Sequence, residues 1–132
     1  MRKLILIAAA LAFGSLAASA DPLQYGARYF QRSDYSRALA SWRPMAIQGN
    51  PVAQNNLGIM YLDGKGVPQK KSESVRYLSL SAATGSLLGQ NNLGGLYRDG
   101  KGLPRDYGKA AQWFSASAAQ GIPPACKIGP DV

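Results

Sequence analysis

QNNLGIMYLDGKGVPQKKSESVRYLSLSAATG, residues 54–85, is followed by a second version of itself, QNNLGGLYRDGKGLPRDYGKAAQWFSASAAQG, residues 90–121. The two blocks keep a constant offset of 36 residues. Self-similarity at a period of about 20 to 50 residues is typical of repeat proteins, in which each unit stacks on its neighbours. The duplicated stretch therefore decides the architecture, and the rest of the chain is interpreted by comparison with it.

Each block is predicted to form two helices joined by a glycine-rich turn. In the first helix the apolar residues recur at spacings of three and four, which places them on one helical face. Glycine is favoured directly after a helix end because it accepts positive φ without a Cβ clash. A second glycine and a proline then delay the next helix. The first helices carry Leu57, Met60 and Tyr61 or Leu93, Leu96 and Tyr97, the turns carry Gly64 and Gly66 or Gly100 and Gly102, and the second helices are expected at about 72–84 and 107–120.

Gly58 and Gly94 stand inside the expected first helices, at the same place in both copies. Glycine in a helix interior costs about 1 kcal/mol relative to alanine. We therefore expect a close approach between the paired helices at these positions. The alternative is that both copies inherited the glycine from one duplicated ancestor without a packing requirement.

The order of these features resembles the Sel-one-like repeat (SLR) family, a relative of the tetratricopeptide repeat. The family pattern is a helix ending in leucine-glycine-x-x-tyrosine, then a glycine-x-glycine-valine-proline turn, and a second helix with an aromatic pair, two alanines and a closing glycine. The matching positions are Leu57, Gly58, Tyr61, Gly64, Gly66, Val67, Pro68, Tyr77, Leu78, Ala82, Ala83 and Gly85, then Leu93, Gly94, Tyr97, Gly100, Gly102, Leu103, Pro104, Ala110, Trp113, Phe114, Ala118, Ala119 and Gly121. The resemblance implies an all-α fold, an αα-hairpin solenoid similar to the tetratricopeptide superhelix.

The length of the chain, 132 residues, favours a one-domain organisation. Residues 1–20 combine two positive charges, a short apolar run and a small-x-small ending, which is typical of a secretory signal peptide cleaved after Ala20. The expected product is a bacterial periplasmic or secreted protein without a transmembrane span. Residues 21–49 are predicted to form a diverged helix pair, 50–85 and 86–121 the two repeats, and 122–132 a capping turn or loose tail. In the diverged pair, Pro44 is expected to kink or shorten the second helix.

The composition argues against several classes of function. The chain has no histidine, which removes the commonest general base and zinc ligand, and no run has metal-ligand spacing. Its one cysteine, Cys126, cannot form an intrachain disulfide. The net charge of +8 falls to +6 without Arg2 and Lys3, and the basic residues are scattered rather than gathered on a nucleic-acid-binding face. We therefore expect no metal, no cofactor and no nucleic-acid partner.

The first helices of stacked pairs line the concave surface of a solenoid, which is its usual binding face. The more exposed side of these helices is predicted to carry the partner-binding residues, although a merely solvated helix face is an equal alternative. Side chains that differ between the copies, such as Leu62 against Arg98, are suited to partner choice. The candidate binding residues are Asn55, Ile59, Leu62, Asn91, Gly95 and Arg98.

The resemblance implies an exported, non-catalytic adaptor that binds another protein or a peptide. Some cysteine-rich relatives have been linked to β-lactam-like cell-wall compounds, so the alternative is an envelope enzyme or binder acting on peptidoglycan-like ligands. This chain lacks the paired cysteines of those relatives. A third interpretation is electrostatic attachment to anionic lipid or envelope polysaccharide, which moderate salt would abolish.

Overall fold

The computed structural model describes residues 21–120, so the expected signal peptide and the expected cap or tail at 122–132, with Cys126, lie outside the described residues. Residues 21–120 form helices and no strand, which confirms the predicted all-α class. The helices are α2 (Pro22–Gln31), α3 (Tyr35–Ile47), α4 (Pro51–Asp63), α5 (Lys71–Ala83), α6 (Leu87–Asp99) and α7 (Tyr107–Ala118).

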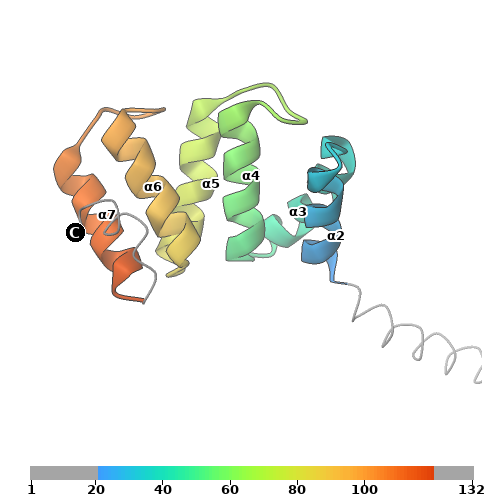
Figure 1. Cartoon of the computed structure of the whole chain (residues 1–132), viewed down its shortest axis with the longest axis horizontal. Coiled ribbons are helices and arrows are strands. Elements are labelled where there is room, and N and C mark those ends of the chain that lie inside the picture. The colour runs from blue at the N-terminus through green and yellow to red at the C-terminus, as the bar shows by residue number, and fades with distance from the viewer. Residues whose placement is uncertain (1–20, 121–132) are drawn as a thin grey trace, which may run out of the picture.

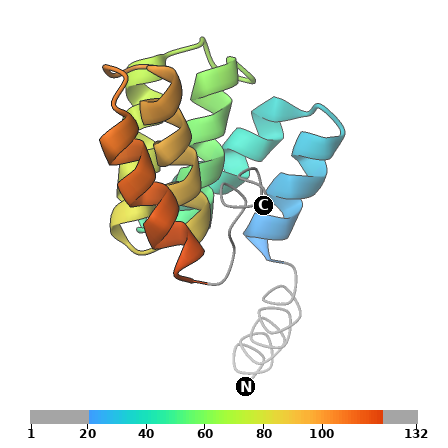
Figure 2. The same ribbon diagram turned by 60° about the vertical axis from the view of Figure 1, so that its left-hand side comes forward.

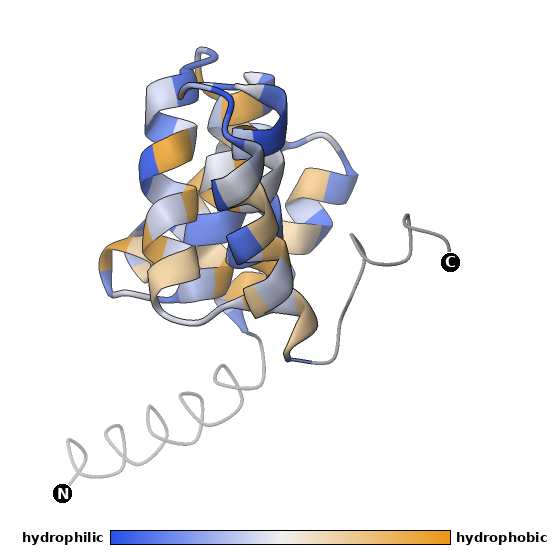
Figure 3. Ribbon diagram, turned by 90° about the vertical axis from the view of Figure 1, so that its left-hand side faces the viewer, coloured by the Kyte–Doolittle hydropathy of each residue, from blue (hydrophilic) through white to orange (hydrophobic). Residues whose placement is uncertain are grey.

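The helices form three successive pairs, α2–α3, α4–α5 and α6–α7 (Figure 1). Each second helix also packs on the first helix of the next pair, and α4 packs directly on α6. Figure 2 shows the α2–α3 pair at one end of the block formed by α4 to α7. Hydrophilic and hydrophobic bands alternate along the helices (Figure 3), as expected where each helix buries only part of its circumference.

Side-chain caps explain where most of the helices begin. A short polar side chain accepts a hydrogen bond from a backbone N–H of the first turn, which satisfies a donor that has no partner inside the helix. Only α5 lacks such a cap among the described helices, since Lys70 precedes it. The capping residues are Asp21, Asp34, Asn50, Ser86 and Asp106.

The two first helices of the repeats end at left-handed glycines. Gly64 has a φ of 69° and Gly100 a φ of 66°, and each donates its backbone N–H to the carbonyl oxygen of the fourth residue before it, Met60 or Leu96. A side chain in this conformation would be strained, so both turns require glycine. The helix ends therefore lie where the sequence pattern placed them.

A glycine in the first helix of every pair lies against a large side chain of the second helix. A Cβ on Gly58 would lie 2.7 Å from Leu78 Cγ, and a Cβ on Gly94 would lie 2.8 Å from Phe114 Cδ1. The diverged pair repeats the arrangement, with Gly26 against the indole ring of Trp42. The close approach expected from the mid-helix glycines is thus present in all three pairs.

The second glycine of each turn joins neighbouring pairs. A Cβ on Gly66 would lie 2.7 Å from Tyr35 Cβ at the start of α3, and a Cβ on Gly102 would lie 2.8 Å from the carbonyl oxygen of Lys71 at the start of α5. Since Tyr35 and Lys71 are themselves 36 residues apart, each turn packs on the preceding second helix in the same way.

Buried polar side chains tie the helices together with the same periodicity. Within a pair, Ser81 Oγ donates to the carbonyl oxygen of Pro51 (2.8 Å), and Ser117 Oγ donates to that of Leu87 (3.1 Å). Between pairs, a glutamine of the first helix donates to the end of the preceding second helix. These bonds run from Gln54 Nε2 to the oxygen of Ala46 (3.2 Å) and from Gln90 Nε2 to that of Ala82 (3.4 Å).

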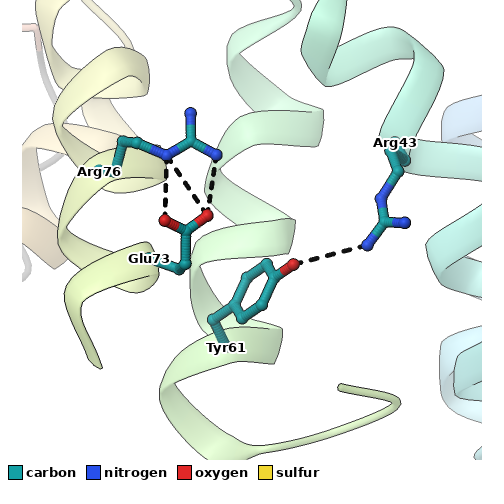
Figure 4. A network of polar contacts seen from close by, with 4 residues as sticks. All are labelled: Arg43, Tyr61, Glu73 and Arg76. Carbon is teal, nitrogen blue, oxygen red and sulfur yellow. Dashed lines mark hydrogen bonds and ion pairs between the residues drawn. The ribbon is translucent and has the colours of Figure 1, made fainter. Parts of the chain in front are cut away.

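The junction between the diverged pair and the first repeat carries an aromatic and ionic cluster (Figure 4). Arg43 of α3 donates from Nη2 to Tyr61 Oη of α4 (3.5 Å), and the Tyr61 ring stacks on Tyr77 of α5 at a centroid distance of 5.7 Å. The Arg76 guanidinium lies 4.3 Å from the Tyr77 ring centroid and pairs with Glu73 (2.9 Å). The cluster therefore links three helices across the junction.

The expected effect of Pro44 on helix length is wrong. Helix α3 continues past Pro44 to Ile47 and has the same 13 residues as α4, α5 and α6. Pro44 lies in the last turn, where the helix loses one backbone hydrogen bond and the end is held by other bonds. One of these runs from Asn50 N to the carbonyl oxygen of Met45 (2.9 Å).

We predict that Gly94→Leu lowers the free energy of unfolding by about 2 kcal/mol or more, because the new side chain collides with Phe114 and separates α6 from α7. Thermal melting followed by circular dichroism would measure the effect. Gly95→Leu is the matched control, since a Cβ there meets only Arg98 Nη2 at 4.0 Å. Equal melting temperatures for Gly94→Leu and the unmodified chain would contradict the packing argument.

Candidate binding face

Five of the six predicted binding residues line one hollow between α4 and α6, which we call the Gly95 hollow. Its volume is about 210 Å³. Ile59 and Leu62 come from α4, whereas Asn91, Gly95 and Arg98 come from α6. The remaining lining residues are Leu78, Asn92, Leu96, Asp99, Lys101 and Phe114.

A second hollow, which we call the Trp42 hollow, lies between the diverged pair and the first repeat. Its volume is about 260 Å³, and its lining is mainly apolar and aromatic. The residues come from α2, α3 and α4, and they are Ala27, Phe30, Gln31, Trp42, Asn56 and Ile59.

Ile59 borders both hollows and forms a ridge between them. Its counterpart in the second repeat is Gly95, 36 residues later, and its counterpart in the diverged pair is Ala27, which follows Gly26 as Ile59 follows Gly58. At equivalent places on three successive first helices, a large residue, Ile59, thus lies between two small residues, Ala27 and Gly95. The result is one face with two adjoining depressions.

The charges around the Gly95 hollow do not cancel. Arg98 Nε donates to Asp99 Oδ1 (3.0 Å), and this contact lowers the pKa of the Asp99 carboxyl from its usual value. Asp99 therefore stays ionised and neutralises Arg98. Lys101 also lines the hollow and forms none of the ion pairs found within residues 21–120, although its charge contributes to lowering the Asp99 pKa. Arg98, Asp99 and Lys101 together therefore leave an excess of one positive charge at the hollow.

Asn55 is a correction to the predicted binding set, because it is not on the exposed side of α4. Only 5% of its surface is exposed. Its Oδ1 accepts a hydrogen bond of 2.7 Å from Asn92 Nδ2 on α6, so Asn55 joins the two repeats. The residue is thus a buried link between α4 and α6 rather than part of the surface of the candidate binding face.

Sequence reasoning missed the Trp42 hollow. The positions of Phe30 and Trp42 in the sequence indicate helix packing alone, and Ala27 carries no chemical signal of its own. Gly26 and Tyr29 keep the spacing of Gly58 and Tyr61, and the same register carried one residue further identifies Ala27 as the counterpart of Ile59. The turn of the diverged pair is four residues shorter, and this hides the correspondence from a search at a fixed period of 36.

Neither hollow is equipped for metal chemistry. Within the described range no three histidine, cysteine, aspartate or glutamate side chains gather at metal-binding distance. Both hollows are also smaller than the roughly 300 Å³ at which small-molecule pockets begin. Hollows of this size suit single side chains of a larger partner.

No helix within residues 21–120 is long and apolar enough to cross a membrane.

The fold and the face define an αα-hairpin repeat scaffold. The Sel1 repeat family matches residues 51–86 and 87–122, and the chain belongs to this family. No curated protein matches the sequence.

Among the solved structures that share the fold are the following two. One is a protective antigen present in uropathogenic Escherichia coli strains, displaying an SLR fold, which is 38% identical with a TM-score of 0.71 and covers 76% of this chain. The other is a Sel1 repeat protein from Oxalobacter formigenes, 27% identical with a TM-score of 0.71 over 77% of this chain. The match spans only 22% of the first protein and 41% of the second.

We predict that Asn55→Ala lowers the free energy of unfolding by about 1 kcal/mol, because it leaves the Asn92 amide without its partner. Asn91→Ala, at the equivalent place in the second repeat, is the control and should change stability little. Urea denaturation of Asn55→Ala, Asn92→Ala and the double variant would give the coupling energy. Strict additivity would show that the bond between the repeats contributes nothing.

Proposed function

We propose that this chain is an SLR scaffold that binds a segment of another protein along the face formed by α2, α4 and α6, without catalysis of its own. The observation that carries the proposal is the pair of adjoining hollows that share Ile59. Sel1 repeats generally mediate protein interactions, which supports the same class of partner.

The size and spacing of the hollows favour a peptide segment over a small molecule. Each hollow accommodates about one side chain, and a continuous backbone crossing the Ile59 ridge can fill both. Such an occupant makes contacts with three helix pairs at once. Because the groove is already formed, its own residues lose little conformational entropy when a segment binds. The entropy loss falls mainly on the bound segment of the partner.

The scaffold is proposed to act after export. The support is the sequence of residues 1–20, with Arg2 and Lys3, the apolar run and the small residues before Asp21. Asp21 also caps α2, with its Oδ1 accepting from Leu23 N at 2.9 Å, so cleavage after Ala20 would leave the first helix with its cap.

We predict that Ile59→Asp abolishes capture of the partner, because it places a charge on the ridge between the hollows. Crosslinking from native envelopes, followed by mass spectrometry, would compare the variant with the unmodified chain. Leu80→Asp on α5 is the matched control, since Leu80 is 42% exposed and lines neither hollow.

Both variants should melt near the temperature of the unmodified chain. A loss of partner capture by Ile59→Asp would then come from the changed surface and not from unfolding. Retention of the same crosslinked proteins by Ile59→Asp would contradict the proposal. Sedimentation with isolated cell wall and turnover of a β-lactam reporter test the alternative separately. Turnover by the unmodified chain would overturn the non-catalytic assignment.

A second prediction concerns export. Expressed from its full sequence in a bacterium, the protein should be recovered outside the cytoplasm with Asp21 as its first residue, and intact mass would show this. Ile7→Lys should keep the chain in the cytoplasm with residues 1–20 attached, because the charge interrupts the apolar run. A cytoplasmic, full-length product from the unmodified gene would refute export.

A further inference from the structure

Gly95 is a glycine that the packing of the helices does not require. Its neighbour Gly94 lies against Phe114, whereas a Cβ on Gly95 would meet nothing closer than the far end of the Arg98 side chain, 4.0 Å away. Glycine in a helix interior nevertheless costs stability relative to alanine. Helix α6 therefore carries a destabilising residue whose only structural effect is the open space above it.

The first repeat shows that a large side chain is compatible with this position. Ile59 occupies the equivalent place in α4, directly after Gly58. In α6 the corresponding space is part of the Gly95 hollow. The difference between the two copies is thus a filled position in one and a vacant, side-chain-sized position in the other.

The lining of the Gly95 hollow indicates the chemistry of its occupant. The interior is apolar, with Leu78, Leu96 and Phe114, and the amides of Asn91 and Asn92 lie at the hollow as well. Arg98, Asp99 and Lys101 line the hollow as well, and because Asp99 is the one carboxylate among them, these three side chains leave an excess of one positive charge. An apolar stem with an anionic tip matches this lining, and among the amino acids glutamate has that form.

The Trp42 hollow differs in charge. No ionisable side chain lines it, and Phe30, Trp42, Ala27 and Ile59 provide apolar surface. An aliphatic or aromatic side chain matches this hollow. Because the two hollows share Ile59, one segment that crosses this residue can place a side chain in each of them.

We propose that the Gly95 hollow is a specificity pocket for an acidic side chain, so that the partner is an acidic peptide segment with a neighbouring apolar residue for the Trp42 hollow. The inference rests on the proposed function, since it names the chemistry of the segment bound on the same face. Gly95 acts by leaving room for the stem, and Lys101 supplies the charge.

The proposal predicts opposite effects of one substitution on stability and on binding. Gly95→Ala should raise Tm by several degrees, about 4–8 °C for a domain of this size, because the helix gains propensity and no contact is lost. The same substitution should weaken peptide binding, because the methyl group occupies part of the hollow. A fall in Tm would show that packing requires the glycine and would overturn the inference.

The experiment uses a displayed library of random 12-residue peptides selected on the purified chain. The enriched sequences should place Glu or Asp close to Leu, Phe or Trp. One enriched peptide, synthesised with a fluorescent label, is then titrated by anisotropy. Exchange of its acidic residue for the neutral amide should weaken binding about tenfold, in line with a charge-assisted contact.

Gly95→Ile should weaken binding of this peptide at least about tenfold, since it gives α6 the side chain that α4 already has. Lys101→Met should remove the preference for the acid over its amide. Ala111→Ile, an exposed alanine of α7 outside both hollows, is the control and should bind like the unmodified chain.

The outcomes separate this inference from the proposed function. Enriched peptides without an acidic residue would refute the specificity pocket, and so would a Gly95→Ile variant that binds the peptide as tightly as the unmodified chain. If the enriched peptides still lost binding to the Ile59→Asp variant, the scaffold function would stand. Failure to enrich any peptide, or binding unaffected by Ile59→Asp, would refute both.

Discussion

The close approach of paired helices at a glycine is the constraint on which the structure depends. Gly58 admits Leu78, Gly94 admits Phe114, and Gly26 admits Trp42, so each first helix receives a large side chain where a Cβ would collide. This contact fixes how near the two helices of a pair can lie. The helical propensity lost at the glycine is offset by burial, since Leu78 and Trp42 are almost completely buried.

The contacts between pairs repeat just as regularly. The glycine turns rest on the start of the preceding second helix, and Gln54 and Gln90 bind the end of that helix. With both ends of the junction held, the side chains between them face one another in a fixed register. Such regular junctions explain how sequence can vary on the exposed side of the first helices without altering the stack.

That freedom is concentrated at the position after each packing glycine. Ala27, Ile59 and Gly95 follow Gly26, Gly58 and Gly94, and they alternate small, large and small. One residue of the helical turn therefore belongs to the scaffold and the next to the proposed binding face. The separation of roles between adjacent residues lets the face change its chemistry while the helices keep their spacing.

The sequence by itself determined the helices, the turns and the order of the pairs, because these depend on local patterns that recur at an offset of 36. Gly64 and Gly100 end helices for reasons of backbone conformation, and Asp34 and Asp106 begin them by capping, so no distant contact is needed. It also placed Ile59, Leu62, Asn91, Gly95 and Arg98 on one side of the first helices.

The sequence could not show which residues of that side are buried and where its surface is hollowed. Asn55 has the same periodicity as its counterpart Asn91, yet within residues 21–120 it is Asn55 that bonds to an amide of the following repeat, that of Asn92, and Asn55 is buried. The two hollows were likewise decided by the tertiary structure, because a depression is formed by side chains of several helices and by the absence of one at Gly95, which no single helix specifies.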